Sequence, residues 1–102
     1  MLVQVTQEII DSSIRLNCDK CAVAEAINAV LSDKFKVVVG VSAHIYKSEN
    51  VEFRHTECIA PLTSIYLGGR VNGFIRRFDS GEAVKPISFE IDIPSTHLKE
   101  KQ

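Results

Sequence analysis

Residues 87–94 carry the clearest alternation of apolar and polar side chains in the chain. Ile87, Phe89, Ile91 and Ile93 alternate with polar residues, which include Glu90 and Asp92. Successive side chains of a strand point to opposite faces, so this pattern predicts an antiparallel strand with one buried and one solvated face. Residues 2–5 (LVQV) predict a shorter strand, and we expect the first and last strands to be neighbours.

Three segments have helical spacing instead. Thr6 is a suitable N-cap for a first helix from Gln7 to Arg15, and Asn17 for a second helix from Cys18 to Leu31. The second helix is predicted by an apolar stripe and by its alanines. A third, shorter helix is predicted around residues 70–78, with Gly81 as its terminating residue.

The region between the second and third helices is rich in β-branched and aromatic residues. It predicts one or two strands in residues 35–48, bent near Gly40, a strand in 51–59 and another in 63–67. Because strands and helices do not alternate strictly, we expect an α+β fold. It would have a mostly antiparallel sheet of four to five strands, two N-terminal helices and one short helix before the last strand. Residues 1–94 form a single domain in this interpretation, and residues 95–102 a frayed polar tail.

The charge of the chain gives little support to nucleic-acid binding. Its 102 residues include 12 basic and 13 acidic side chains, for a net charge of −1, whereas a nucleic-acid module usually has a basic excess. The best local basic cluster is Arg70, Arg76 and Arg77, which would equally suit a solvated helix face. No signal peptide or membrane-spanning apolar run is evident, so we expect a cytoplasmic protein without membrane contact.

The three cysteines raise the question of a metal site. Cys18 and Cys21 would lie one turn apart at the start of the second helix, where free amides and the helix dipole favour a thiolate. With His55 and Cys58 they give the pattern C-x2-C-x33-H-x2-C, a Cys3His set for zinc that uses every cysteine. The second pair lies in a predicted strand, where residues three apart face opposite sides, so a turn or bulge would be required.

Two other interpretations of Cys18 and Cys21 compete with zinc. A C-x2-C pair is also typical of thiol oxidoreductases, but there it usually follows a strand within a βαβ unit, and here a helix precedes it. The simplest alternative is that Cys21 packs in the core and Cys18 is partly exposed, because unmodified cysteine often behaves as a small apolar side chain. On that alternative no cofactor is expected.

No pattern in the chain is typical of a catalytic centre. The histidines are scattered, and no serine stands in a nucleophile elbow. The glycines near Arg70 lack the lysine-serine ending of a phosphate-binding loop. Asp79 and Glu82 are more typical of a cap and a solvated turn than of a catalytic pair. The sequence therefore favours a protein that is not an enzyme.

Several segments together resemble a family of small uncharacterised proteins of bacteria, phages and other mobile elements. They are VTQEII near the start, NCDKCAVAEAI after it, and FIRRFDSGEAVKPISFEIDIP near the end. Similar sequences often have proline after the second cysteine, where this chain has Ala22. The resemblance implies a single α+β domain and no named activity, so it carries over no catalytic residue.

The leading functional prediction is a small non-enzymatic protein that acts by protein–protein contact. A phage or mobile-element origin suggests inhibition of a host defence complex. The predicted contact residues are Arg70, Arg76 and Arg77 on the third helix and Glu90 and Asp92 on the last strand, and strand-edge pairing could form a homodimer. The alternatives are a Cys3His zinc domain that contacts nucleic acid, and a thiol oxidoreductase.

Overall fold

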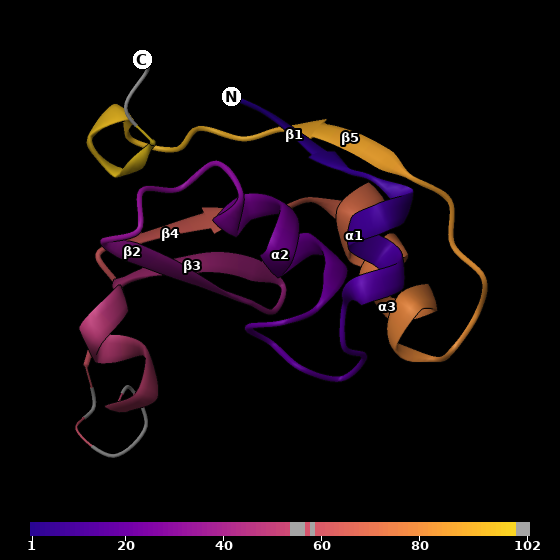
Figure 1. Cartoon of the computed structure of the whole chain (residues 1–102), viewed down its shortest axis with the longest axis horizontal. Coiled ribbons are helices and arrows are strands. Elements are labelled where there is room, and N and C mark those ends of the chain that lie inside the picture. The colour runs from indigo at the N-terminus through magenta and orange to yellow at the C-terminus, as the bar shows by residue number, and fades with distance from the viewer. Residues whose placement is uncertain (54–56, 58, 100–102) are drawn as a thin grey trace.

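A computed structural model gives the fold of the chain and describes residues 1–53, 57 and 59–99. The elements follow one another along the chain in this order: β1 (Leu2–Val5), α1 (Gln7–Ser12), α2 (Ala22–Asn28), β2 (Phe35–Val39), β3 (Ser42–Lys47), the 3-10 helix η1 (Ser48–Phe53), β4 (Thr63–Tyr66), α3 (Gly69–Asp79), β5 (Ile87–Glu90) and the 3-10 helix η2 (Ser95–His97) (Figure 1). The predicted α+β class is confirmed.

The strands form two separate antiparallel sheets rather than one. β1 pairs with β5, with Val3 opposite Phe89, which confirms that the first and last strands are neighbours. The other sheet has the order β2-β3-β4, and its two pairings place Val38, His44 and Ser64 in one row. The hairpin between β2 and β3 turns at Gly40, as the sequence predicted.

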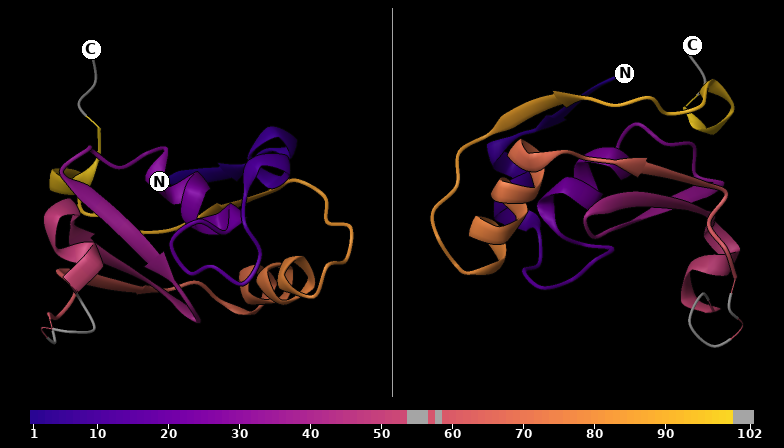
Figure 2. Two further views of the ribbon diagram at one scale, coloured as in Figure 1. Left: turned by 60° about the horizontal axis from the view of Figure 1, so that its bottom comes forward. Right: turned by 180° about the vertical axis from the view of Figure 1, so that it is seen from behind.

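The α2 helix lies in the core between the two sheets (Figures 1 and 2) and contacts both β1 and β2. A helix with apolar residues around most of its surface is normally buried, and α2, which has only Glu25 and Asn28 as polar residues, follows this rule. Five of its seven residues are at most 2% exposed: Ala22, Val23, Ala24, Ala26 and Ile27. The alanines therefore allow two layers to approach the helix closely. Among the described residues, no helix is long and apolar enough to cross a membrane.

The first helix begins as predicted and ends earlier. The Thr6 hydroxyl accepts a hydrogen bond from the Ile9 amide at 3.2 Å, which confirms the N-cap. The predicted end at Arg15 is wrong, because Ser13 already has an extended backbone with ψ at 162°. The Ser13 hydroxyl donates back to the Ile9 carbonyl, a local bond that competes with the helix.

The second helix begins at Ala22, four residues later than predicted, and ends at Asn28, three residues before the predicted end at Leu31. The Asn17 side chain accepts from the amides of Asp19 and Lys20, and the Asn17 carbonyl accepts from the Cys21 amide at 2.9 Å. These bonds close a separate turn over residues 17–21, so Cys18 is not the first helical residue. Cys21 is the N-cap instead.

The third helix matches its prediction closely and ends in a Schellman motif. Gly81 has a φ of +87°, and its amide donates to the Phe78 carbonyl while the Glu82 amide donates to the Arg77 carbonyl. This pair of bonds satisfies carbonyls that would otherwise be left at the helix end. Only glycine adopts this φ without steric cost, which confirms Gly81 as the terminating residue.

The predicted strand over residues 51–59 is wrong in its first part. Residues 48–53 form η1, which buries Val51 and leaves Phe53 47% exposed, whereas a strand would have placed both on one face. The remainder of that prediction falls largely on residues 54–56 and 58, outside the described part. The predicted strand at 63–67 is confirmed as β4.

The segment after β5 is docked on the core where we expected a frayed tail. The His97 carbonyl accepts from the Ser32 amide at 2.9 Å, and the Lys99 amide donates to the Val30 carbonyl at 3.1 Å. The His97 ring also lies 4.4 Å, centroid to centroid, from the Phe35 ring. Backbone hydrogen bonds and an aromatic contact therefore hold residues 95–99 in place, and the polar composition of this segment does not predict either of them.

Candidate functional site

The structure describes two of the four predicted zinc ligands, Cys18 and Cys21. Cys18 lies at the surface, whereas Cys21 is 4% exposed. His55 and Cys58 lie outside the described residues. Among the residues described, no group of three or more His, Cys, Asp or Glu side chains could hold a metal ion. Of the predicted Cys3His set, the described part of the chain therefore contains only the C-x2-C pair.

The environment of Cys21 favours the thiol. Burial raises the pKa of Cys21 above its ordinary value of 9.0, although the backbone amides of Ala24 and Val23 act in the opposite direction. For Cys21, this outcome corrects the expectation that the helix start would favour a thiolate. A buried thiol with a raised pKa is a poor nucleophile, so Cys21 is not the attacking thiol of a C-x2-C pair.

The segment that contains the C-x2-C pair closes one edge of the three-stranded sheet. The Val39 amide donates to the Cys18 carbonyl at 2.7 Å, and the Val37 amide donates to the Asn28 side-chain oxygen at 3.0 Å. Both amides belong to β2 and point away from β3. Residues 17–28 thus provide the hydrogen-bond acceptors for the outer edge of β2, a structural role that the sequence pattern did not predict.

The three arginines of the predicted basic cluster are exposed but do different things. The Arg70 guanidinium donates to the Ser88 carbonyl on the outer edge of β5. Arg77 lies beside Gly73 on its own helix, where its guanidinium nitrogen would be 3.4 Å from an added β-carbon. Arg76 faces the tip of the β2–β3 hairpin. They therefore form no single basic patch.

The predicted acidic residues lie on the opposite side of the fold from the three-stranded sheet. Glu90 is exposed in β5, and its carboxylate lies 3.2 Å from the amino group of Met1. Asp92 follows the strand and is also exposed. Glu90 stands opposite Leu2 in the β1–β5 pairing, and both acidic side chains are exposed, as the alternation predicted. An exposed ion pair of this kind contributes little to stability.

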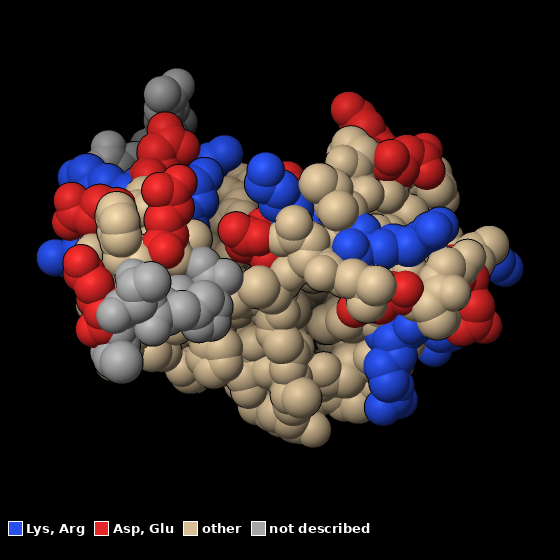
Figure 3. Space-filling view, turned by 90° about the horizontal axis from the view of Figure 1, so that it is seen from below, with Lys and Arg blue, Asp and Glu red and all other residues tan. Residues whose placement is uncertain are grey.

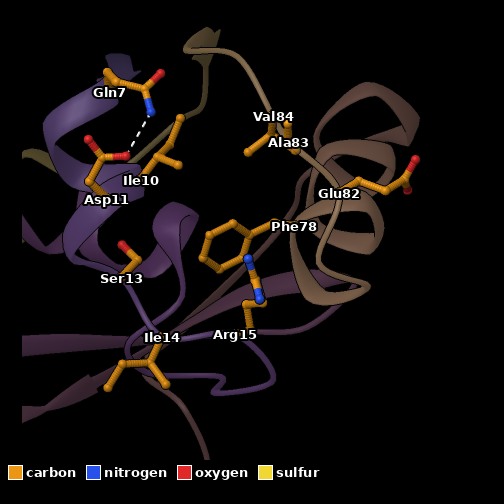
Figure 4. A pocket seen from close by; sticks show the side chains of 10 residues that line it. All are labelled: Gln7, Ile10, Asp11, Ser13, Ile14, Arg15, Phe78, Glu82, Ala83 and Val84. Carbon is orange, nitrogen blue, oxygen red and sulfur yellow. Dashed lines mark hydrogen bonds between the residues drawn. The ribbon is translucent and has the colours of Figure 1, made fainter.

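A cavity of about 720 Å³ lies between α1 and the segment that follows α3 (Figure 4). Its polar groups do not converge. Asp11 accepts from the Gln7 amide nitrogen at 2.8 Å, and Glu82 accepts from the Ser80 hydroxyl at 3.1 Å and points away from α1. Asp79 is outside the cavity and accepts from the Leu16 amide at 2.9 Å. The arrangement offers a surface for binding and no acid–base pair.

The outer sheet face is the side of β2–β3–β4 opposite α2. It presents three rows, read from the register: Tyr66 with Ser42; Ser64 with His44 and Val38; and Tyr46 with Lys36. The His44 ring nitrogen Nδ1 lies 2.8 Å from the Ser64 hydroxyl. Seen from below, the molecule shows a broad area without charged side chains, with charges gathered above it and at its flanks (Figure 3).

At one end of the outer sheet face, the hairpin tip, β4 and α3 surround a shallow cavity of about 380 Å³. We call it the hairpin–helix hollow and define it by Val41, Tyr66, Ile75 and Arg76. Val41 is 66% exposed and Tyr66 69% exposed. The Asn72 side chain donates to the Val41 carbonyl at 3.2 Å and to the Gly68 carbonyl at 2.8 Å, so the hairpin tip is fixed against the helix.

The hollow combines residue types that are favoured in protein interfaces. Tyrosine and arginine are enriched among interface residues that contribute most to binding energy. Of its members, the sequence analysis had singled out only Arg76. The exposure of Val41 could have been predicted, because an apolar residue directly after the turn glycine Gly40 lies at a hairpin tip, away from the core. Tyr66 gave none, because its exposure depends on β4 being the last strand of its sheet.

Comparison with known proteins finds no similar family, protein or structure. The chain matches no protein-family model, and neither the curated proteins nor the solved structures contain a match to it.

Proposed function

We propose that this chain is a small cytoplasmic binding protein that acts by contact with a partner protein through the hairpin–helix hollow and the adjoining outer sheet face. The observation that carries the proposal is the exposure of Val41 and Tyr66 beside Arg76, in a hollow whose other lining residues are uncharged. Contiguous exposed apolar surface on a folded domain commonly marks an interaction site. The hydrogen bonds of Asn72 keep this surface preformed, which reduces the entropy lost on binding.

A binding role is better supported than an enzymatic one. The large cavity beside α1 brings no ionisable pair together, and burial raises the pKa of Cys21, the buried thiol of the described C-x2-C pair. The hollow itself holds one cation and no acid, base or nucleophile. These arrangements suit recognition. The resemblance to phage and mobile-element proteins suggests a host defence complex as the partner.

The experiment is affinity capture from a lysate of the source organism, followed by binding measurements with the purified partner. The test variant combines Val41→Ser with Arg76→Ala, which alters the hollow and leaves β4 intact. Leu16→Asn is the matched control, because it removes a more exposed apolar side chain, 82% exposed, from a loop that does not line the hollow. Asparagine also tolerates the positive φ of 57° at this position.

We expect the double variant to bind the purified partner at least about tenfold more weakly than the native chain, as the loss of interface anchors would cause. The Leu16→Asn control should bind as the native chain does. Equal affinity of the double variant and the control for every captured protein would refute the proposal.

A further inference from the structure

The outer edge of β4 has backbone groups that point away from its own sheet. In β2 the amides of Val37 and Val39 face away from β3, so the even-numbered residues of β3 face β2 and its odd-numbered residues face β4. The register Ala43–Ile65 then turns the N–H and C=O of Ser64 and Tyr66 outward. Neither residue has a backbone hydrogen bond at this edge, within the described part of the chain.

Within Thr63–Tyr66 the edge contains no lysine and no proline, although the strand is only four residues long and Pro61 lies just before it. Lysines, prolines and bulges within an edge strand discourage association. β4 reads TSIY, and the eleven positions from 59 to 69 carry no charged side chain. The core is also less completely packed at this edge, as the burial of Ile65 shows. Ile65 belongs to the face on which Ala43 and Ile45 are 0% exposed, yet it is only partly buried.

We propose that a second copy of this chain pairs antiparallel with β4, so that two three-stranded sheets join into one. A twofold axis at Ile65 places each Ser64 opposite the partner's Tyr66, and the outward N–H and C=O groups of both residues then bond across the axis. The two Ile65 side chains meet on the inner face, where a β-branched pair is favourable. The neutral segment opposes itself without like-charge repulsion.

This inference does not depend on the function proposed above. The side chain of Tyr66 remains on the outer sheet face in the dimer, so the dimer presents two hairpin–helix hollows on one continuous face. Assembly is measured on the purified chain alone, and partner capture uses variants that leave β4 unchanged. Either proposal can therefore fail without the other.

Sedimentation velocity of the purified chain up to sub-millimolar concentration is the first test, with a dimer of twice 11.3 kDa expected. Ser64→Pro removes an outward N–H without touching the β3–β4 ladder and should give a monomer. Ser64→Ala, which loses the same hydroxyl and keeps the N–H, should remain dimeric. Gln4→Pro should also remain dimeric, because it removes the corresponding outward N–H from β1.

A cysteine at the proposed axis gives a second measurement that does not depend on the folding of the proline variant. The two Ile65 Cα atoms would lie about 4.5 Å apart in a non-hydrogen-bonded pair, within the range that a disulfide spans. Mild oxidation of Ile65→Cys should therefore give a dimer with a 65–65 linkage by mass spectrometry. A monomeric native chain, dissociation by Gln4→Pro instead of Ser64→Pro, or the absence of a 65–65 linkage would each overturn the proposal.

Discussion

The two edges of the three-stranded sheet differ in how their outward backbone groups are satisfied. At β2, the amides of Val37 and Val39 donate to Asn28 and to the Cys18 carbonyl. At β4, the outward groups of Ser64 and Tyr66 have no backbone partner among the described residues. One edge is thus closed from within the chain by the segment 17–28, and the other remains a template for pairing.

This difference shows which edge of the sheet keeps backbone N–H and C=O groups that another chain could bind. An amide that is buried without a hydrogen bond costs free energy, so the half-buried edge at β2 required a local solution. The solvent-exposed edge at β4 can be satisfied by water or by another strand. The segment that contains the C-x2-C pair thus closes the β2 edge of the sheet. The neutral β4 segment, whose outward backbone groups remain available, is the better candidate for contact with another chain.

The largest expected effect comes from comparing two isoleucines of the inner sheet face, one on the central strand and one on the open edge. Ile45 is 0% exposed, and Ile45→Ala should lower the free energy of unfolding by about 2–5 kcal/mol. Ile65 is partly buried, so Ile65→Ala should cost roughly half as much at concentrations where the chain is monomeric. Urea unfolding measures both losses.

Protein concentration sharpens this test. If β4 pairs with a second copy, the cost of Ile65→Ala should rise with concentration while that of Ile45→Ala stays constant. Equal costs for the two substitutions in the monomer would show that the open edge is no less tightly packed than the central strand, and the comparison would fail.

The second prediction concerns the hydrogen bond that closes the β2 edge. Asn28→Ala leaves the partly buried Val37 amide without its acceptor and should cost about 1–3 kcal/mol in urea unfolding. Ser64→Ala is the matched control at the open edge, because it removes an exposed side-chain bond of similar length, 2.8 Å to His44. Its cost should stay within about 0.5 kcal/mol. Similar losses for both variants would contradict the distinction between the edges.

Local patterns predicted those elements whose cause is local. The alternation of less and more exposed side chains in residues 87–93, the turn at Gly40 and the Gly81 helix end are all visible in short windows, and the structure confirms each, although the strand predicted to reach residue 94 ends at Glu90. The strand at 63–67 belongs with them. In each case, the periodicity or a glycine with a required backbone geometry was sufficient.

The failures have causes that are not local, or that involve competing local bonds. Asn17 binds the amides of Asp19 and Lys20, and this turn delays α2 to Ala22. The docking of residues 95–99 depends on contacts with Phe35 and Ser32, more than 60 residues earlier in the chain. The candidate site was predicted only through Arg76, because the open edge at Tyr66 follows from strand order, which no short window contains.

The smallest expected effect is a loss of stability at alkaline pH caused by Cys21, which caps the helix whose Asn28 closes the β2 edge. Burial raises the pKa of Cys21 above 9.0, so the unfolded chain loses this proton first as the pH rises. Stability from this group is complete below pH 9.0 and falls above it, with a slope of at most about 1.4 kcal/mol per pH unit. Urea unfolding between pH 8 and 10.5 measures the slope.

The thiol contribution is isolated by difference, because lysines and tyrosines titrate in the same range. Cys21→Ala should flatten the alkaline slope relative to the native chain, and Cys18→Ala, which leaves Cys21 in place, should retain it. The comparison of edges adds a sharper requirement. Hydrogen exchange at alkaline pH should accelerate at the Val37 and Val39 amides, which depend on residues 17–28, more than at the Ile65 amide, which faces β3. Equal acceleration at all three amides would mean that Cys21 stabilises the whole core and has no particular part in closing the β2 edge.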